Sequence, residues 1–510
     1  MDFVTYSNYI GNREYLYFLC QFLAILGLFA AGIIPIVIIR KRLPVFREIL
    51  FAYPLGISIY GVLGFLLLIT GVRFSVQNII MSFIVLTAGL TFYGHIKPAV
   101  SVSSDPDPES DEAEGKTGGK EILLFFAALA GVAAVALLSC SGILSQYVTN
   151  DSVYYYSMYP SILVKNGFIT ASLDKYLTDV GQTTAVIQCL PFLLGFDQSF
   201  GIQHFLNINF LLIFFTALHD TLCKPIEPER LRLLAAALGT FLLAVSEPFI
   251  VLSKWVLSNV YFMDFLFIVF YLEYRAVMSD EEDRLSDIML FFMTSFLIMS
   301  RMEGGVLVFV MAAAFSALPM KKEKLILHFA LPLIIMELGY YGMVFMKIGV
   351  DPLYSFLDMK AALLMAGMIA ILLVYIILIR DRINISFVPV LLLAALLAGN
   401  AGLLLINHER YLTNIKAFIL NIRQGNGWGL FPAVILIYAV IFIIELVKCR
   451  LRDIPVPVFL PAVLVLAIIA VCFARGGVLA VRTSDSGNRV LMEMVPCVLF
   501  SVYVWGISAV

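Results

Sequence analysis

The chain has 510 residues, of which 61% are hydrophobic and 14% are charged, and its mean hydropathy is +0.96. This composition excludes a water-soluble protein and predicts an all-α protein that crosses a membrane many times. The formal net charge of −2 gives no reason to expect a nucleic-acid partner. The seven cysteines are scattered without a CxxC pair, which is typical of apolar packing residues.

The N-terminus, MDFVTYSNYIGNREYLYF, is polar and acidic. It lacks the basic stretch and cleavage site of a signal peptide, so we expect the spans themselves to direct insertion. About fifteen segments approach the roughly 20 apolar residues that cross a bilayer. They lie at 16–39, 49–69, 78–94, 121–140, 203–221, 232–251, 257–275, 286–300, 304–319, 324–346, 359–379, 386–406, 428–447, 455–473 and 490–508.

Short loops rich in lysine and arginine predict the orientation, because such loops stay in the cytoplasm. If the spans alternate, five basic loops fall on one side of the membrane. The N-terminus is then outside and the C-terminus cytoplasmic, and we expect a multi-pass protein of a bacterial plasma membrane. The five loops contain Arg40, Lys41 and Arg42; Lys224, Arg230 and Arg232; Lys321, Lys322 and Lys324; Arg380 and Arg382; and Lys448, Arg450 and Arg452.

The loop 97–120 is rich in proline, serine and acidic residues, which predicts a disordered cytoplasmic linker. It separates a three-span N-terminal unit, 1–96, from a transmembrane core, 121–510. The first large outside segment of that core, 141–202, contains two helical patterns. Residues 152–166 predict an aromatic helix at the membrane interface, and the apolar stretch 184–196 predicts a juxtamembrane or re-entrant helix, because it is too short to span.

Asp151 stands just outside the fourth span, in the sequence TNDSVYYYSMYP. One interpretation is a helix cap for the residues that follow it. The other is a general base at the membrane surface, which would deprotonate a hydroxyl acceptor. Its neighbours Asn150 and Tyr154 would then line the substrate cavity.

Arg301 and Glu303 lie in IMSRMEGGVLVF, in the middle of about thirty otherwise apolar residues. Charges in such a position are costly and are usually paired or functional. They form either an ion pair at a tight outside turn or a site in which Arg301 faces a lipid-linked phosphate. We favour the second interpretation, with Glu303 in the substrate cavity.

Arg489 begins the last span, in AVRTSDSGNRVLMEMVPCVLF, and Arg482 precedes it. An arginine at a span end commonly reaches toward the headgroups, but a phosphate-binding role fits the other charges predicted on the same face. Those charges are candidates for the substrate cavity. They are Glu247, Lys254, His204, His408, Glu409 and Arg410.

The order of these motifs resembles the GT-C superfamily, the integral-membrane glycosyltransferases that use polyprenyl-phosphate sugars as donors. The resemblance rests on TNDSVYYYSMYPSILVKNG, AVIQCLPFLLGFDQSFGIQHFLN, the turn RMEG and the span opening GNRVLMEMVP. It covers about residues 121–510 and implies a GT-C-like core with juxtamembrane helices in the first outside loop. The three spans before residue 121 are additional to that core.

The resemblance implies that Asp151 is the catalytic base and that Arg489, with Arg301 and Arg482, lies near the donor phosphate. It implies inverting transfer of a sugar from a polyprenyl-phosphate donor to a glycan, lipid or protein acceptor on the outer face. Many members have two adjacent acids, whereas this chain has Asn150 before Asp151. A requirement for a divalent cation such as Mg or Mn therefore stays open.

Two alternatives share much of this pattern. A transporter or flippase of lipid-linked glycans also needs many spans, but its charges commonly lie near the middle of the membrane, where only Asp264 and Glu337 are expected here. A polymerase or ligase of lipid-linked glycans would use similar outside residues. The sequence does not separate it from the transferase.

Overall fold

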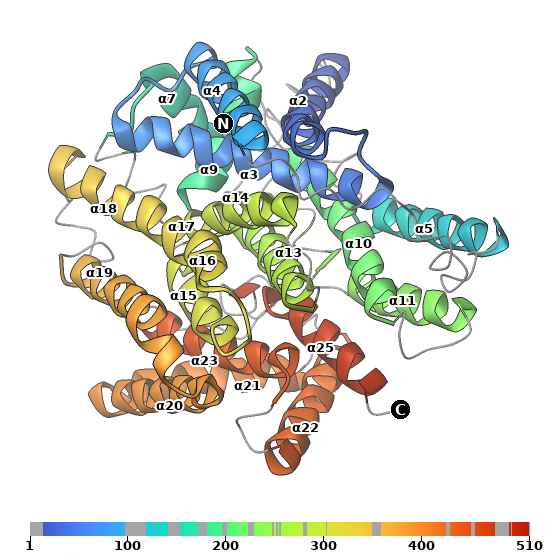
Figure 1. Cartoon of the computed structure of the whole chain (residues 1–510), viewed down its shortest axis with the longest axis vertical. Helices are drawn as coiled ribbons and strands as arrows, with labels where there is room; N and C mark the ends of the chain where they lie inside the picture. Colours follow the sequence, from blue (N-terminus) through green and yellow to red (C-terminus); the bar gives the residue numbers. More distant parts are fainter. Residues whose placement is uncertain are drawn as a thin grey trace.

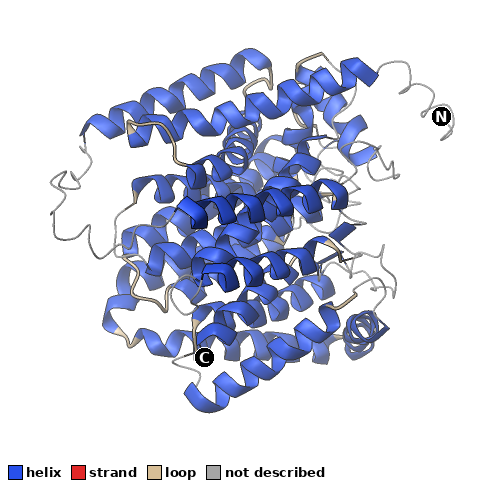
Figure 2. Cartoon of the chain, turned by 90° about the vertical axis from the view of Figure 1, so that its right-hand side faces the viewer, coloured by secondary structure: helices blue, strands red, loops and turns tan. Residues whose placement is uncertain are grey.

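The structure is a computed structural model of the whole chain. It describes residues 14–96, 119–140, 154–170, 173, 181–195, 201–222, 229–246, 249–250, 253, 257–278, 283–301, 303–348, 359–424, 429–449, 454–474, 489–490 and 492–508. Within these ranges the regular structure is helical and contains no strand (Figure 2). This confirms the predicted all-α class.

The helices follow one another along the chain from the N-terminus to the C-terminus (Figure 1). They are α2 (Glu14–Arg40), α3 (Phe46–Thr70), α4 (Val76–Ile96), α5 (Gly119–Ser139), η2 (Tyr154–Met158), α7 (Tyr159–Asn166), α9 (Gln182–Leu193), α10 (Gly201–Leu222), α11 (Glu229–Ala244), α13 (Ser258–Met278), α14 (Arg284–Ser300), α15 (Gly304–Phe315), a continuous run from α16 (Lys322–Leu325) to η5 (Val344–Ile348), α19 (Met359–Val374) with η6 (Tyr375–Ile379), α20 (Val388–Ile406), α21 (His408–Gln424), α22 (Phe431–Cys449), α23 (Val456–Ala474) and α25 (Val495–Ser508).

Ten helices or helical runs within the described ranges are long and apolar enough to cross a membrane. The chain is therefore an all-α protein with several membrane-crossing helices, as its composition predicts. Each of the fifteen predicted spans coincides with a helix or helical run, but five of them are shorter or less apolar than a full span requires. The count of fifteen stays a prediction.

The two short helices of the first outside segment are confirmed as helices. One continuous helix covers η2 and α7, and it ends where Gly167 adopts a left-handed conformation and its N–H bonds the Leu163 carbonyl at 2.7 Å. The second, α9, begins two residues before the predicted stretch 184–196 and ends three residues before its end. It is mostly buried. Residues 97–118 of the predicted linker 97–120 lie outside the described residues. The last two residues of the linker begin α5.

Four of the five predicted basic loops meet at one end of the helix bundle. Arg40 bonds Asp283 at 3.0 Å, and Lys324 approaches Asp287 within 3.8 Å. At the same end Arg47 of α3 pairs with Asp220 of α10, and Lys322 pairs with Asp381. Arg232 pairs with Glu229 within α11. The sequence rule that placed these loops on one side therefore agrees with the packing, whereas their cytoplasmic location stays a prediction.

The N-terminal unit is packed into the core through α3. This helix contacts α9, α10, α14 and α18 (Gly339–Met343), and most of its side chains are buried (Figure 1). Two polar bonds fix it to α10: the Tyr53 hydroxyl donates to the Ile202 carbonyl at 3.1 Å, and the Asn209 amide donates to the Leu50 carbonyl at 3.0 Å. The N-terminal unit thus contributes, through α3, the wall against which α9 and α14 pack.

Helices α2 and α3 approach so closely that their contact requires small residues. A Cβ atom added to Gly56 would lie 1.7 Å from the carbonyl oxygen of Leu28 and 3.0 Å from the amide nitrogen of Gly32. Small residues allow helix backbones to approach in this way in membranes, where van der Waals packing drives association. The pair Gly32 and Gly56 therefore sets the spacing of α2 and α3.

Gly56→Ala is expected to destabilise the protein by about 1–3 kcal/mol, because the added methyl group meets backbone atoms that cannot rotate away. The matched control is Gly89→Ala in α4, where an added Cβ meets no atom within 4 Å. That change should be neutral or stabilising by up to about 1 kcal/mol, since alanine is the better helix former. Thermal unfolding of both variants in detergent checks the prediction, and equal shifts would contradict it.

Candidate functional site

Side chains from distant segments meet at the N-terminus of α13. The Leu257 N–H donates to the Gln203 side-chain oxygen at 2.8 Å, and the Ser258 N–H donates to the Tyr156 hydroxyl at 2.6 Å. The first N–H groups of a helix lack partners within that helix, and here they are buried. A glutamine from α10 and a tyrosine from η2 supply the missing acceptors, so the start of α13 joins three parts of the chain.

Arg301 lies beside this helix start and is held by two carboxylates. Its Nε atom lies 2.5 Å from Glu303 Oε1 and 3.3 Å from Glu493 Oε1, and its Nη1 atom donates to the Ser258 hydroxyl at 3.1 Å. All four side chains are buried. The turn therefore contains the ion pair of Arg301 and Glu303, and Arg301 is the cation of a buried cluster.

Glu493 completes the cluster from the C-terminal end of the chain. Its Oε1 atom accepts from the Asn259 amide at 2.8 Å, and its side chain is fully buried just before α25. Glu493, Asn259 and Ser258 were absent from the predicted site. The signal for Glu493 was available, because it is an acidic residue within the apolar start of the last predicted span, four positions after Arg489.

Two of the three candidate phosphate-binding arginines, Arg301 and Arg489, lie near Tyr156. Burial raises the pKa of the Tyr156 hydroxyl, and Ser258, Arg301 and Arg489 act in the opposite direction. Arg301 is 6% exposed, whereas Arg489 is half-buried. Of the two guanidinium groups, Arg489 is therefore the more accessible to a ligand.

Helix α9 docks with its N-terminus on the end of α14, directly before Arg301. The Thr183 hydroxyl donates to the Phe296 carbonyl at 3.0 Å, and the Thr184 hydroxyl donates to the Ser300 carbonyl at 3.2 Å. Carbonyl groups at a helix C-terminus need such partners. The short apolar stretch after the aromatic helix therefore fixes the position of the turn that carries Arg301.

Several predicted site residues lie outside the described residues. They are Asn150, Asp151, Glu247, Lys254 and Arg482. The backbone of Tyr154 begins η2, but its side chain is outside the description. The catalytic role of Asp151 and the phosphate role of Arg482 are thus predictions without a structural counterpart.

The remaining predicted residues separate into two places. His204 is buried on α10 and directly follows Gln203, whose side chain bonds the start of α13. His408, Glu409 and Arg410 begin α21, an amphipathic helix in a segment predicted only as an outside loop, and this helix packs on α20, α22 and α23. His408 and Glu409 are exposed, and Arg410 donates to the Phe473 carbonyl at the end of α23. Among the described residues, no hydrogen bond or ion pair joins these three side chains to the Arg301 cluster.

The Arg410 guanidinium also lies 4.7 Å from the centre of the Phe473 ring. Cation–π contact and a carbonyl at a helix end are ordinary stabilising partners of arginine. Arg410 therefore holds α21 against the end of α23, which gives it a structural role that the sequence did not predict.

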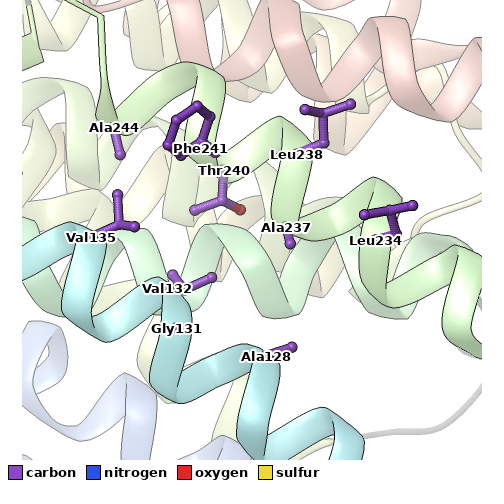
Figure 3. A pocket seen from close by; sticks show the side chains of 10 residues that line it. All are labelled: Ala128, Gly131, Val132, Val135, Leu234, Ala237, Leu238, Thr240, Phe241 and Ala244. Carbon is purple, nitrogen blue, oxygen red and sulfur yellow. The ribbon is translucent and has the colours of Figure 1, made fainter.

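A separate apolar pocket lies between α5 and α11 (Figure 3). Its volume is about 420 Å³, and it is lined by aliphatic and aromatic side chains that include Val132, Leu238 and Phe241. The one lining hydroxyl, on Thr240, already donates to the Ala236 carbonyl within its own helix. The pocket contains none of the predicted site residues and offers hydrocarbon contacts only.

The cluster consists of buried charged and polar side chains that are held in place by one another in an apolar surrounding. Two arginines and two glutamates give no net formal charge, and Arg301 is already neutralised by its carboxylate neighbours. Among the described residues, no group of three or more His, Cys, Asp or Glu side chains is arranged to hold a metal ion. The described part of the site thus contains one guanidinium paired with carboxylates, Arg301, and a second, half-buried guanidinium, Arg489.

Comparison of the chain with known protein families, curated proteins and solved structures finds no match.

Proposed function

We propose that the protein is a membrane glycosyltransferase that moves a sugar from a polyprenyl-phosphate donor to an acceptor on the outer face of the membrane. The observation that carries the proposal is the meeting of three sequence motifs at one place. Tyr156, Arg301 and Arg489 come from the aromatic helix, the RMEG turn and the start of the last span. These are the motifs on which the resemblance to the GT-C superfamily rests.

The location of the cluster supports this chemistry. It lies at the ends of α14 and α13, away from the basic loops at the other end of the bundle. A polyprenyl-phosphate donor keeps its tail in the bilayer and its phosphate at the surface, so residues at helix ends can reach the sugar–phosphate bond. Asp151 precedes Tyr156 by five residues, which is at most about 18 Å of extended chain.

We assign different roles to the two arginines. Arg489 would bind the donor phosphate and stabilise the negative charge that develops on the leaving lipid phosphate. Arg301 would hold the turn and α13 in place through Glu303, Glu493 and Ser258. Asp151 would remove a proton from the acceptor hydroxyl, and a single displacement at the anomeric carbon would invert its configuration.

Asp151→Asn is expected to lower transfer by about 10²–10⁴-fold, the usual contribution of a general base. The measurement is transfer of labelled hexose from polyprenyl-phosphate hexoses by purified protein, with a membrane extract as the acceptor source. The matched control is Asp381→Asn, an exposed acid in a basic loop at the other end of the bundle, which should leave transfer unchanged.

Arg489→Ala should weaken binding of a short-chain polyprenyl phosphate, whereas Asp151→Asn should leave that binding intact. Full transfer activity of Asp151→Asn would refute the assignment of the base. Absence of both transfer and polyprenyl-phosphate binding in the unaltered protein would refute the proposed function itself.

A further inference from the structure

Two buried polar side chains in the bundle have no partner within the described residues. Asp264 on α13 and Asn207 on α10 are both fully buried. Both carboxyl oxygens of Asp264, and both the oxygen and the nitrogen of the Asn207 amide, lack a hydrogen bond in this part of the chain. More than nine in ten buried polar groups are hydrogen-bonded, to protein or to ordered water. The side chains of Asp264 and Asn207 therefore require a further hydrogen-bond partner between the helices.

Contacts on either side of Asn207 and Asp264 along the helix axes define the face that α10 and α13 present to each other. At the outer end, the Gln203 side chain bonds the Leu257 N–H. Deeper in the bundle, the ring of Phe267 lies 5.8 Å from that of Phe210 and 4.9 Å from that of Phe214, between ring centres. The two helices therefore run parallel, with one stripe of α10 against one stripe of α13.

Asn207 and Asp264 occupy these two facing stripes. Asn207 comes four residues after Gln203 and three before Phe210, and Asp264 comes three residues before Phe267. Residues three, four or seven apart share a helix face. Both side chains therefore lie in the interface of α10 and α13, between the outer contact and the phenylalanine contacts.

The surroundings of Asp264 contain no positive charge to balance a carboxylate. Within the described residues it forms no ion pair with lysine, arginine or histidine, and every residue of α13 from Ser258 to Glu273 is buried. An isolated carboxylate in such a place is strongly disfavoured relative to the neutral acid. A neutral carboxyl group still has one O–H donor and an acceptor oxygen, and the amide of Asn207 has both donors and an acceptor.

We propose that Asp264 and Asn207 form an internal water site between α10 and α13, in which a bound water bridges the neutral carboxyl of Asp264 and the amide of Asn207. Such a water makes about three hydrogen bonds to polar groups that would otherwise be unsatisfied, and these two side chains supply them. The site also gives the chain a proton-holding group inside the bundle. Glycosyl transfer makes no use of such a group, whereas a transporter could.

Infrared difference spectroscopy of the purified protein tests the site without any substrate. The carbonyl-stretch band of a protonated carboxylic acid should be lost in Asp264→Asn and should shift in D₂O. The control Asp381→Asn, an exposed carboxyl at the basic end, should leave that band unchanged. Asn207→Leu should keep the band but shift it, because the carboxyl loses its bridge through water.

Two results would overturn the proposal. One is a spectrum in which Asp264→Asn removes only carboxylate bands, with thermal stabilisation of the unaltered protein by sodium but not by choline, since Asp264 would then hold a cation. The other is an unshifted band in Asn207→Leu, which also decides the question if Asp264→Asn fails to fold. Because no transfer assay is involved, either result leaves the glycosyltransferase proposal untouched.

Discussion

Arg301→Ala is expected to destabilise the protein by about 3–5 kcal/mol, the usual effect of removing one partner of a buried ion pair. The change leaves Glu303 and Glu493 buried close to each other without the guanidinium that lies between them. It also removes the donor to the Ser258 hydroxyl at the start of α13. We expect a marked fall in the midpoint of thermal unfolding in detergent.

The matched control for Arg301 is Arg382→Ala, which removes an exposed guanidinium and should change stability by no more than about 0.5 kcal/mol. Combining Arg301→Met with Glu303→Gln and Glu493→Gln should recover much of the lost stability, because no unpaired charge then remains buried. Equal effects of Arg301→Ala and Arg382→Ala would mean that the cluster does not stabilise the fold.

Gly181→Ala is expected to disturb the contact between α9 and α14 directly beside Arg301. Gly181 has a φ of +87°, and an added Cβ would lie 2.0 Å from the Ser300 carbonyl oxygen. With a ψ of 134°, the backbone of Gly181 lies outside the common regions of non-glycine residues, and such strain costs roughly 1–3 kcal/mol. Overpacking against backbone adds about 1–3 kcal/mol, so the total loss should be about 2–6 kcal/mol.

Gly195→Ala separates these two contributions. Gly195 has a similar φ of +85°, but a Cβ there meets no atom within 4 Å. Its substitution should therefore show the conformational cost alone, and the difference between the two variants in thermal unfolding measures the packing of α9 on α14. Indistinguishable variants would show that α9 can move away from Ser300 at no cost.

The helices of this protein were predictable because their cause is local. A segment inside a bilayer must satisfy its own backbone hydrogen bonds, so each long apolar run becomes a helix wherever it lies in the chain. The aromatic helix before Gly167 was also found from local spacing. In contrast, α21 was missed because it is amphipathic. Its apolar residues are separated in the sequence by polar ones, so they do not form an apolar run.

The candidate site was predicted only in part. Arg301, Glu303 and Arg489 were identified because charges are rare in apolar segments, but their partners were not. Asn259 and Glu493 are 234 residues apart in the chain, and no spacing rule relates them. The sequence equally favoured His408, Glu409 and Arg410, which the fold places on a different helix.

The sequence by itself determined the membrane-crossing, all-α character of the protein, the positions of most of its helices and the grouping of four of its five basic loops. These features follow from hydropathy and local backbone hydrogen bonding, which depend on nearby residues only. The tertiary structure alone decided that α3 is central and that Arg301 is paired with two glutamates. Such pairings depend on which helices are neighbours, and that is set by packing over the whole chain.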